Sequence, residues 1–187
     1  MDPALIRRRL AARRPRRMNE PGVQAAAVAL ILVPGPRGLE ALFIRRARHP
    51  QDPWSGQVGL PGGRRDRGDA TLYATAARET AEETGIRLKR PDLLGELDDL
   101  HPRTAALPAI VIRPFVFALP ARPRLRPNPE VAYPFWLPLT ALRPSRGHPV
   151  IRGRRLSVPC LRAGRRMIWG LTFRILTKVL SPVTVAS

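Results

Sequence analysis

The chain has 187 residues, enough for one domain with a packed core but too few for two domains of ordinary size. Hydrophobic residues make up 44% of the sequence, which excludes a disordered chain, and the aromatic share of 5% predicts a core of mainly aliphatic side chains. The formal net charge of +19 favours an anionic partner, although nearly all of it is arginine, which can equally reflect the base composition of the gene.

The first twenty residues differ in composition from the rest of the chain. Residues 6–17 are rich in arginine, and Pro15 would end any short helix that forms there. We therefore expect a basic, solvated arm over residues 1–20, followed by a single domain over residues 21–187. An arm of this charge is also compatible with anion binding.

Apolar segments in the first half of the chain predict strands. Residues 25–33 predict a central buried strand, residues 34–38 a turn, and residues 40–45 the second strand of a hairpin. A short strand is expected over residues 57–60. The longest apolar stretch, residues 23–33, is too short to cross a bilayer as a helix, and no small-residue cleavage site follows it. We therefore expect no membrane partner.

Residues 70–84 follow a helical pattern, with Asp69 placed to cap the start of the helix and Gly85 to end it. The later elements that we expect are strands over residues 93–97, 109–119 and 133–137, a short helical turn over residues 138–142, and an amphipathic helix over residues 170–180. This order predicts an α/β fold with a mixed sheet packed between helices.

An acidic cluster on the first of these helices suggests chemistry. Glu79, Glu82 and Glu83 lie at positions i, i+3 and i+4, so their carboxylates share one helix face. Three like charges this close repel one another unless a cation joins them, and Mg²⁺ prefers oxygen ligands and bridges carboxylates to phosphates. Taken alone, the adjacent pair Glu82-Glu83 is more typical of an ordinary solvated helix face.

The residues around the cluster favour the functional interpretation. Gly62 and Gly63 precede the helix, and without side chains they can bend sharply and bring backbone groups close to an ion or a phosphate. Arg78 is adjacent to the cluster and is placed to hold one glutamate through a bidentate contact.

Together these residues resemble the signature of the Nudix hydrolases: a glycine, five residues, a glutamate, seven residues, and then Arg-Glu-apolar-x-Glu-Glu-x-Gly-apolar. The matching residues are Gly63, Arg78, Glu79, Glu82, Glu83, Gly85 and Ile86. Asp69 stands at the first glutamate position, one extra residue separates it from Arg78, and Thr80 replaces the usual aliphatic residue. The resemblance implies a Nudix-type α/β/α sandwich with a mixed β-sheet between helices.

Within that family the chain is most similar to the coenzyme A pyrophosphatase branch. The similar segments are Ser55–Gly63, the Asp-for-Glu change with the longer spacing, Leu94–Asp99 and Ile168–Thr172. Arg46-Ala47 fits the Arg-Ser/Ala pair of the branch's coenzyme A motif. However, Gln51–Trp54 stand where the motif has an arginine region, and Leu60 replaces its usual phenylalanine.

The resemblance also implies roles for single residues. Glu79 and Glu83 would ligate Mg²⁺ or Mn²⁺ with the Gly63 carbonyl, and Glu82 would ligate or assist through water. Glu82 and Glu130 are the candidates for the general base, and Arg78 joins Glu79 and these two in the expected catalytic set. Around the expected cleft, the candidates for binding the substrate's phosphates are Arg45, Arg46, Arg64, Arg65 and Gly62.

The expected substrate is a small diphosphate molecule, either coenzyme A or an acyl derivative, with NADH, ADP-ribose and oxidised or ordinary nucleoside triphosphates as alternatives. A basic nucleic-acid-binding module is the alternative from another class, but charge alone supports it and we do not expect nucleic acid as the partner. The family resemblance is compatible with a homodimer. Cys160 is the only cysteine, so it forms no internal disulfide; we expect it to be buried and the protein to be cytoplasmic.

Overall fold

The computed structural model describes residues 2–49, 55–102, 109–151 and 153–180. Its central strand, β1 (Gln24–Gly35), consists mainly of alanine, valine, leucine and isoleucine and is buried over most of its length. A tight turn connects β1 to its antiparallel neighbour β2 (Gly38–Arg46). The expected strand and hairpin are confirmed.

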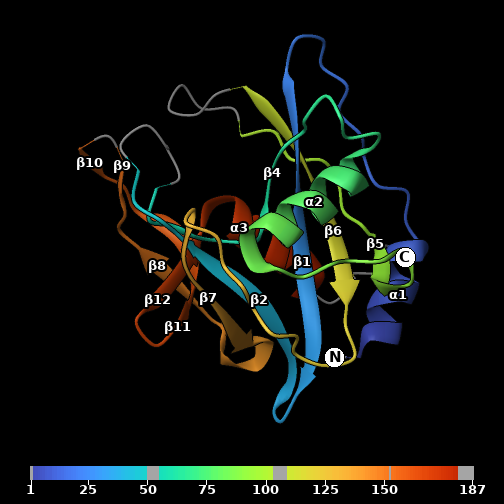
Figure 1. Cartoon of the computed structure of the whole chain (residues 1–187). Helices are drawn as coiled ribbons and strands as arrows, with labels where there is room; N and C mark the ends of the chain where they lie inside the picture. Colours follow the sequence, from blue (N-terminus) through green and yellow to red (C-terminus); the bar gives the residue numbers. More distant parts are fainter. Residues whose placement is uncertain (1, 50–54, 103–108, 152, 181–187) are drawn as a thin grey trace, which may run out of the picture.

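The main sheet has β1 near its centre, as Figure 1 shows. Its further strands are β3 (Val58–Gly59), β4 (Gly62–Arg64), β5 (Leu93–Glu96), β6 (Ile110–Ala118) and β7 (Val131–Pro138). β1 runs parallel to β6 and antiparallel to β2 and β4, which confirms a mixed sheet.

The short strands β3 and β4 lie where the hairpin opens. β1 and β2 pair over residues 32–35 and 38–41, near the turn. Farther from the turn, β4 pairs with residues 26–28 of β1, and β3 pairs with residues 44–45 of β2. The Gly62-Gly63 bend is therefore held by the sheet itself.

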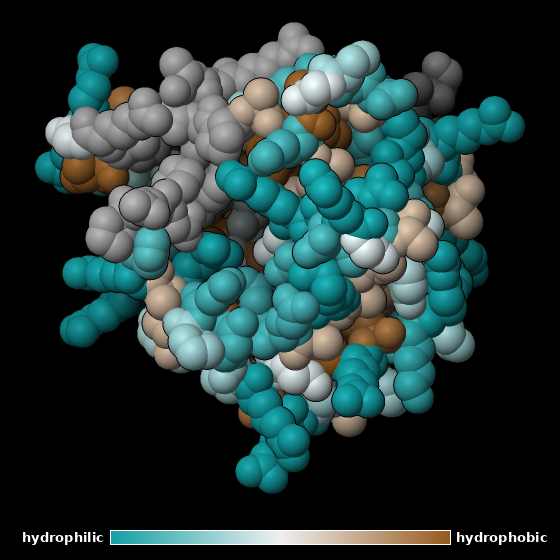
Figure 2. Space-filling view, turned by 45° about the horizontal axis from the view of Figure 1, so that its top comes forward, coloured by the Kyte–Doolittle hydropathy of each residue, from teal (hydrophilic) through white to brown (hydrophobic). Residues whose placement is uncertain are grey.

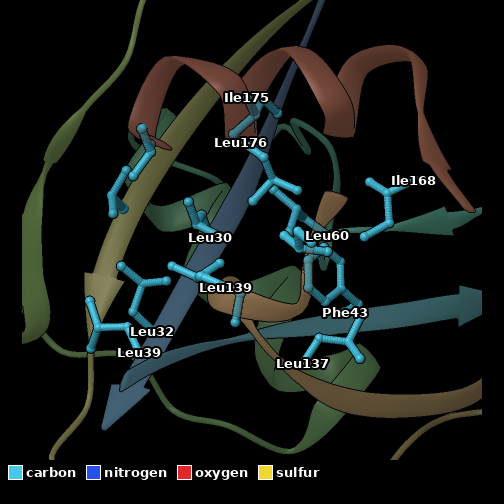
Figure 3. Packing of buried hydrophobic residues seen from close by; sticks show 14 of the residues in the cluster. Leu30, Leu32, Leu39, Phe43, Leu60, Leu137, Leu139, Ile168, Ile175 and Leu176 are labelled. Carbon is cyan, nitrogen blue, oxygen red and sulfur yellow. The ribbon is translucent and has the colours of Figure 1, made fainter. Parts of the chain in front are cut away.

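Helices cover both faces of the sheet. α2 (Leu72–Thr84) crosses one face of β1 and β6, and α3 (Gly170–Leu180) lies behind them in Figure 1. Successive side chains of β1 alternate between these faces, so Ala29 packs in the cluster beneath α2 while Leu30 belongs to the larger cluster of the opposite face. Figure 3 shows that α3 contributes Ile175 and Leu176 to the larger cluster. The α/β/α arrangement is confirmed.

The expected start of α2 was wrong. The N-cap is Thr71, whose side chain accepts the Ala74 N–H, and the helix begins at Leu72. Asp69 instead bonds the Asp66 N–H and Arg78, because the loop folds back before the helix begins. The expected end is confirmed, since Gly85 adopts a left-handed conformation with φ of 77°.

The C-terminal half contains strands that the sequence pattern did not predict. These are β8 (Arg143–Gly147), β11 (Val158–Ala163) and β12 (Arg166–Trp169), which form one small sheet, and β9 (Val150–Ile151) and β10 (Arg154–Arg155), which pair with each other. Frequent arginine and proline hide the alternation expected of a strand. Short 3₁₀ turns occur at Arg90–Asp92 and, within the predicted helical turn, at Leu139–Ala141. Cys160 is buried, as expected.

The N-terminal segment is not the solvated arm that we expected. Residues 3–11 form helix α1 (Pro3–Ala11), which packs against β5 and buries Ile6 and Leu10. Gly95 of β5 allows this approach, since a Cβ there would lie 2.7 Å from the Leu10 Cβ.

Arginines that follow α1 form ion pairs with a distant acidic segment. Arg13 and Arg16 pair with Asp98, and Arg17 pairs with Asp99. These acids lie more than 80 positions away in the sequence, so no local pattern predicts the pairing. These ion pairs neutralise part of the positive charge on which the alternative of a nucleic-acid-binding module depended.

The surface in Figure 2 is hydrophilic over most of the face shown, with only small apolar areas. Among the described residues, none of the helices has the length and apolar character needed to cross a membrane.

Candidate active site

Glu83 is the most deeply buried carboxylate of the site, with 1% of its surface exposed. It lies on the last turn of α2, where its Oε2 accepts the Gly62 N–H at 2.8 Å and its Oε1 lies 3.4 Å from an Arg46 guanidinium nitrogen. Burial raises the pKa of Glu83 to about 7, against the lowering effects of the Gly62 N–H and Arg46. The fold therefore maintains a carboxylate that is costly to ionise without a cation.

Both glycines of the bend are required by close contacts. A Cβ at Gly62, where φ is 145°, would overlap the carbonyl oxygen of Ala27 on β1. A Cβ at Gly63 would lie 2.5 Å from the Glu79 carboxyl carbon. The Gly62 N–H donates to Glu83, so this backbone group orients a carboxylate of the site, and substrate binding by Gly62 stays a prediction.

Glu79 lies one turn earlier on α2, beside Gly63. Arg78 approaches its Oε1 to 3.0 Å. Burial raises the pKa of Glu79; Arg78 opposes this effect, while the charges of Glu82 and Glu130 add to it. Glu79 and Glu83 therefore share a region of negative potential next to the glycine bend.

Arg78 holds this region together. Its guanidinium makes a bidentate contact with Asp69 at 3.1 and 3.0 Å and also donates to the Arg64 carbonyl at 3.1 Å. The hydrogen bonds from Arg78 hold the pKa of Asp69 well below its usual range, against the opposite effect of burial. The sequence predicted a bidentate contact to a glutamate; the bidentate partner is Asp69 instead, the residue that stands at a glutamate position in the family signature.

Glu82 does not join the other two glutamates in a single cluster. Its side chain is 52% exposed and accepts a hydrogen bond from Arg78 at 3.0 Å. Within the part of the chain that the structure describes, no three acidic, histidine or cysteine side chains form a ready-made metal-binding group. The three glutamates thus lie on one helix, but Glu82 is exposed and paired with Arg78, while Glu83 is buried beside the glycine bend.

Glu130 lies close to the site although it is distant in sequence. Its backbone carbonyl accepts the Ala47 N–H at 2.8 Å at the end of β2, and its charge contributes to the raised pKa values of both Glu79 and Glu83. Glu130 is exposed, so its carboxylate is accessible from solvent.

Three of the four arginines proposed to bind phosphate lie in different places. Arg46 reaches Glu83, whereas Arg45 pairs across the strands with Tyr133 and shares the opposite face of β2 with Phe43. Alternation along β2 therefore separates Arg45 from the carboxylates. Arg64 is exposed beside the bend, and its described contact with the site is made by its backbone carbonyl.

Sequence reasoning missed the structural role of Arg65. Its guanidinium donates to the Asp69 and Ala70 carbonyls, which closes the loop that presents Asp69 to Arg78. Because arginine is so frequent in this sequence, nothing marked Arg65 out for this role. The segment Gln51–Trp54, which departs from the coenzyme A motif, lies outside the described residues.

Comparison with known proteins identifies the family. Residues 23–154 match the NUDIX domain. The chain belongs to the Nudix family. An uncharacterized Nudix hydrolase, NudL of Photorhabdus laumondii, is 33% identical over 176 residues, which cover 91% of this chain and 90% of that protein.

Two further matches cover a smaller share of this chain. An uncharacterized protein of Schizosaccharomyces pombe is 39% identical over 106 residues, which cover 54% of this chain but only 32% of that protein. The NUDIX domain of Shewanella oneidensis NrtR, solved with ADP ribose, superposes with a TM-score of 0.53 at 23% identity, covering 65% of this chain and 79% of that one. The latter likeness shows a shared Nudix fold.

As a Nudix hydrolase, the protein is a pyrophosphohydrolase that acts on nucleoside diphosphate derivatives, and enzymes of this family generally use divalent metal ions. The residues present fit such an ion. Glu79 and Glu83 supply hard oxygen donors, and burial leaves the charge of Glu83 poorly solvated. Gly63 lies close to the Glu79 carboxylate, so its backbone atoms are also near the expected ion.

Proposed function

We propose that this Nudix hydrolase cleaves the diphosphate linkage of coenzyme A or its acyl derivatives, with Mg²⁺ or Mn²⁺ held by Glu79, Glu83 and the Gly63 carbonyl. The observation that carries the catalytic part of the proposal is the burial of Glu83 beside Glu79, under a glycine bend that is itself fixed to the central strand. A buried carboxylate whose ionisation is costly is what a divalent cation stabilises most.

The choice of coenzyme A is supported by sequence. Arg46-Ala47, the Ser55–Gly63 segment and the Asp69 substitution resemble the coenzyme A pyrophosphatase branch. Arg46 is also the arginine that lies next to the carboxylates, where the substrate's phosphates would bind.

Several residues of the chain position the proposed metal ligands. Arg78 and Asp69 hold Glu79 and the glycine bend in position, and the Gly62 N–H orients Glu83. When bound, the divalent ion would neutralise the diphosphate and lower the pKa of a water molecule that attacks phosphorus.

Glu82 and Glu130 are the two candidates for the general base, and the structure favours Glu130. Glu82 is held by Arg78, whereas Glu130 is exposed and its charge influences both Glu79 and Glu83. Comparing the pH dependence of turnover for Glu130→Gln and Glu82→Gln separates them, since only loss of the base removes the acidic limb of the profile.

A substrate panel tests the proposal. Purified protein is incubated with coenzyme A, an acyl-coenzyme A, NADH, ADP-ribose and nucleoside triphosphates, with Mg²⁺ or Mn²⁺ and with Glu83→Gln as the control. We expect coenzyme A to yield a phosphopantetheine product and an adenosine bisphosphate. ADP-ribose is the second candidate, because the structurally similar NrtR domain was solved with that ligand. Preferential turnover of ADP-ribose, NADH or a triphosphate would replace coenzyme A while leaving the family activity intact.

In line with its single buried cysteine, we place the protein in a reducing compartment, the cytoplasm.

A further inference from the structure

The connection between β6 and β7, residues 119–130, runs along the face of β2 that lies toward α2. It forms no regular helix or strand and is drawn in Figure 1 as an irregular trace. Side chains alternate along β2, so Glu40 lies on the same face as Leu42, which packs in the cluster beneath α2. Leu125, in the middle of the connection, packs against that cluster. We refer to residues 119–130 as the strap.

A buried ion pair anchors the beginning of the strap. Glu40 is 2% exposed, and its Oε2 accepts hydrogen bonds from Arg122 Nε, at 2.7 Å, and from Arg122 Nη2. Gly35 leaves room for this carboxylate, because a Cβ there would lie 2.5 Å from the Glu40 Cδ. Arg46, which contacts the site, lies six residues farther along β2, about 20 Å away. The Glu40–Arg122 pair therefore stands apart from the proposed metal ligands.

Backbone hydrogen bonds attach the rest of the strap beside the site. The Arg126 N–H donates to the carbonyl of Thr84, the last residue of α2, at 2.8 Å. The Glu130 carbonyl accepts the Ala47 N–H, also at 2.8 Å, just beyond the end of β2. The strap thus connects the helix that carries the proposed metal ligands to the favoured candidate for the general base.

Prolines stiffen the strap between its attachments. The attachments at Arg122, Arg126 and Glu130 are four residues apart. The strap contains Pro120, Pro123, Pro127 and Pro129. Each proline fixes its own φ and restricts the residue before it, so few backbone rotations remain free between one attachment and the next. A stiff segment transmits a displacement at one attachment instead of absorbing it.

We propose that Glu40 is a positioning residue: through Arg122 it fixes the strap, and the strap holds the Glu130 carboxylate in place relative to Glu79 and Glu83. This inference rests on the proposed function, in which Glu130 is the general base. Glu130 is near enough for its charge to raise the pKa of both glutamates. A general base contributes about 10²–10⁴-fold to turnover, and a misplacement of about 1 Å can cost about 10²-fold. Release of the anchor would therefore lower turnover without removing any group from the site.

The test is a double-mutant cycle between the anchor and the base. Turnover by Arg122→Gln, Glu130→Gln and the double variant is compared with the wild type at saturating Mg²⁺. The substrate is coenzyme A, or ADP-ribose if the substrate panel selects it. We expect Arg122→Gln to lower kcat about tenfold when Glu130 is present. In the Glu130→Gln background the same change should lower kcat by less than about twofold, because no base is left to misplace.

Two controls separate positioning from a loss of charge or of stability. Arg124→Gln removes the same charge from an exposed position of the strap, two residues from the anchor, and should keep kcat within about twofold of the wild type. Asp98→Asn removes the partner of Lys178, a buried ion pair outside the strap, and should also keep wild-type kcat. Arg122→Lys, which retains a cation for Glu40, should recover most of the turnover that Arg122→Gln loses.

Arg122→Gln leaves the Glu40 carboxylate buried without its partner, which can prevent folding. Should it do so, Glu40→Gln combined with Arg122→Gln replaces it in the cycle, because this pair of changes leaves no buried charge. We expect the same tenfold loss of kcat and the same dependence on Glu130.

A wild-type kcat after loss of the anchor, or an equal loss in both backgrounds, would overturn the positioning role and leave the proposed function standing. A wild-type kcat in Glu130→Gln would overturn both the general base and its positioning, while the metal-dependent hydrolysis would stand. A wild type that turns over no compound of the panel would overturn all of these proposals together.

Discussion

Replacing Glu83 with glutamine separates the stability of this protein from its activity. Glutamine has the same shape as glutamate and retains an oxygen to accept the Gly62 N–H, but it has no charge. It therefore removes the metal ligand while keeping the packing of a residue that is 1% exposed.

The expected gain in stability follows from the pKa of Glu83. Burial raises it from 4.5 to about 7, and at about 1.4 kcal/mol per pH unit the ionised side chain costs the folded, metal-free protein about 3 kcal/mol. Since the folded-state pKa is raised, this cost is absent below about pH 4.5, grows as the pH rises, and is complete above about pH 7. At pH 8 without metal, Glu83→Gln should therefore be more stable than the wild type by about 2–3 kcal/mol.

The assay is urea unfolding at pH 8 and pH 5 in the presence of a chelator, with Glu82→Gln, an exposed neighbour, as the control. We expect most of the difference between Glu83→Gln and the wild type to vanish at pH 5 and the control to stay within about 0.5 kcal/mol of the wild type. Turnover of the same variant should fall by orders of magnitude, because the ligand of the catalytic ion is lost. A Glu83→Gln protein that is less stable than the wild type at pH 8, or that keeps its pH dependence, would refute the reasoning.

Three other substitutions test the surroundings of the site. Gly62→Ala should cost at least about 2 kcal/mol in urea unfolding, because a Cβ there overlaps the Ala27 carbonyl oxygen at a φ that alanine rarely adopts; wild-type stability would contradict this close contact. Thr80→Val should raise the unfolding free energy by about 1 kcal/mol at unchanged turnover, since the buried Thr80 hydroxyl has no hydrogen-bond partner within the described residues; a loss of stability would show that the hydroxyl is satisfied. Burial alone would raise the pKa of Asp98, but hydrogen bonds from Lys178 and the N-terminal arginines hold it well below its usual range. Asp98→Asn should thus be less stable than the wild type by about 2 kcal/mol at pH 7, and this difference should shrink as the pH falls from 4 toward 2. A difference in unfolding free energy at pH 2 equal to that at pH 7 would argue against these hydrogen bonds.

Much of the fold could be predicted because its signals are local. The apolar run of β1, the turn that follows it and the capping position of Gly85 each depend on neighbouring residues. By contrast, α1 was missed as a packed element because it packs against β5, and the arginines that follow it pair with Asp98, both far along the chain. The strands of the small C-terminal sheet were missed because arginine and proline interrupt their alternation.

For the site, spacing predicted which residues meet but not which partner each would take. The glycine bend and Glu79 lie together as their spacing implied. The bidentate contact of Arg78 with Asp69 depends on how the loop before α2 folds back, which no periodic pattern encodes. Successive side chains of a strand point to opposite faces, so the separation of Arg45 from Arg46 could have been predicted from the assignment of β2 as a strand.

The central claim is that Glu79 and Glu83 together hold a divalent cation beneath the Gly62-Gly63 bend. Anomalous scattering from crystals grown with Mn²⁺ tests it most directly, because it locates the ion without reference to turnover. We expect one strong peak within coordination distance, about 2.2 Å, of oxygens from both glutamates. A well-occupied Mn²⁺ bound elsewhere, with Glu83 still paired to Arg46, would contradict the account.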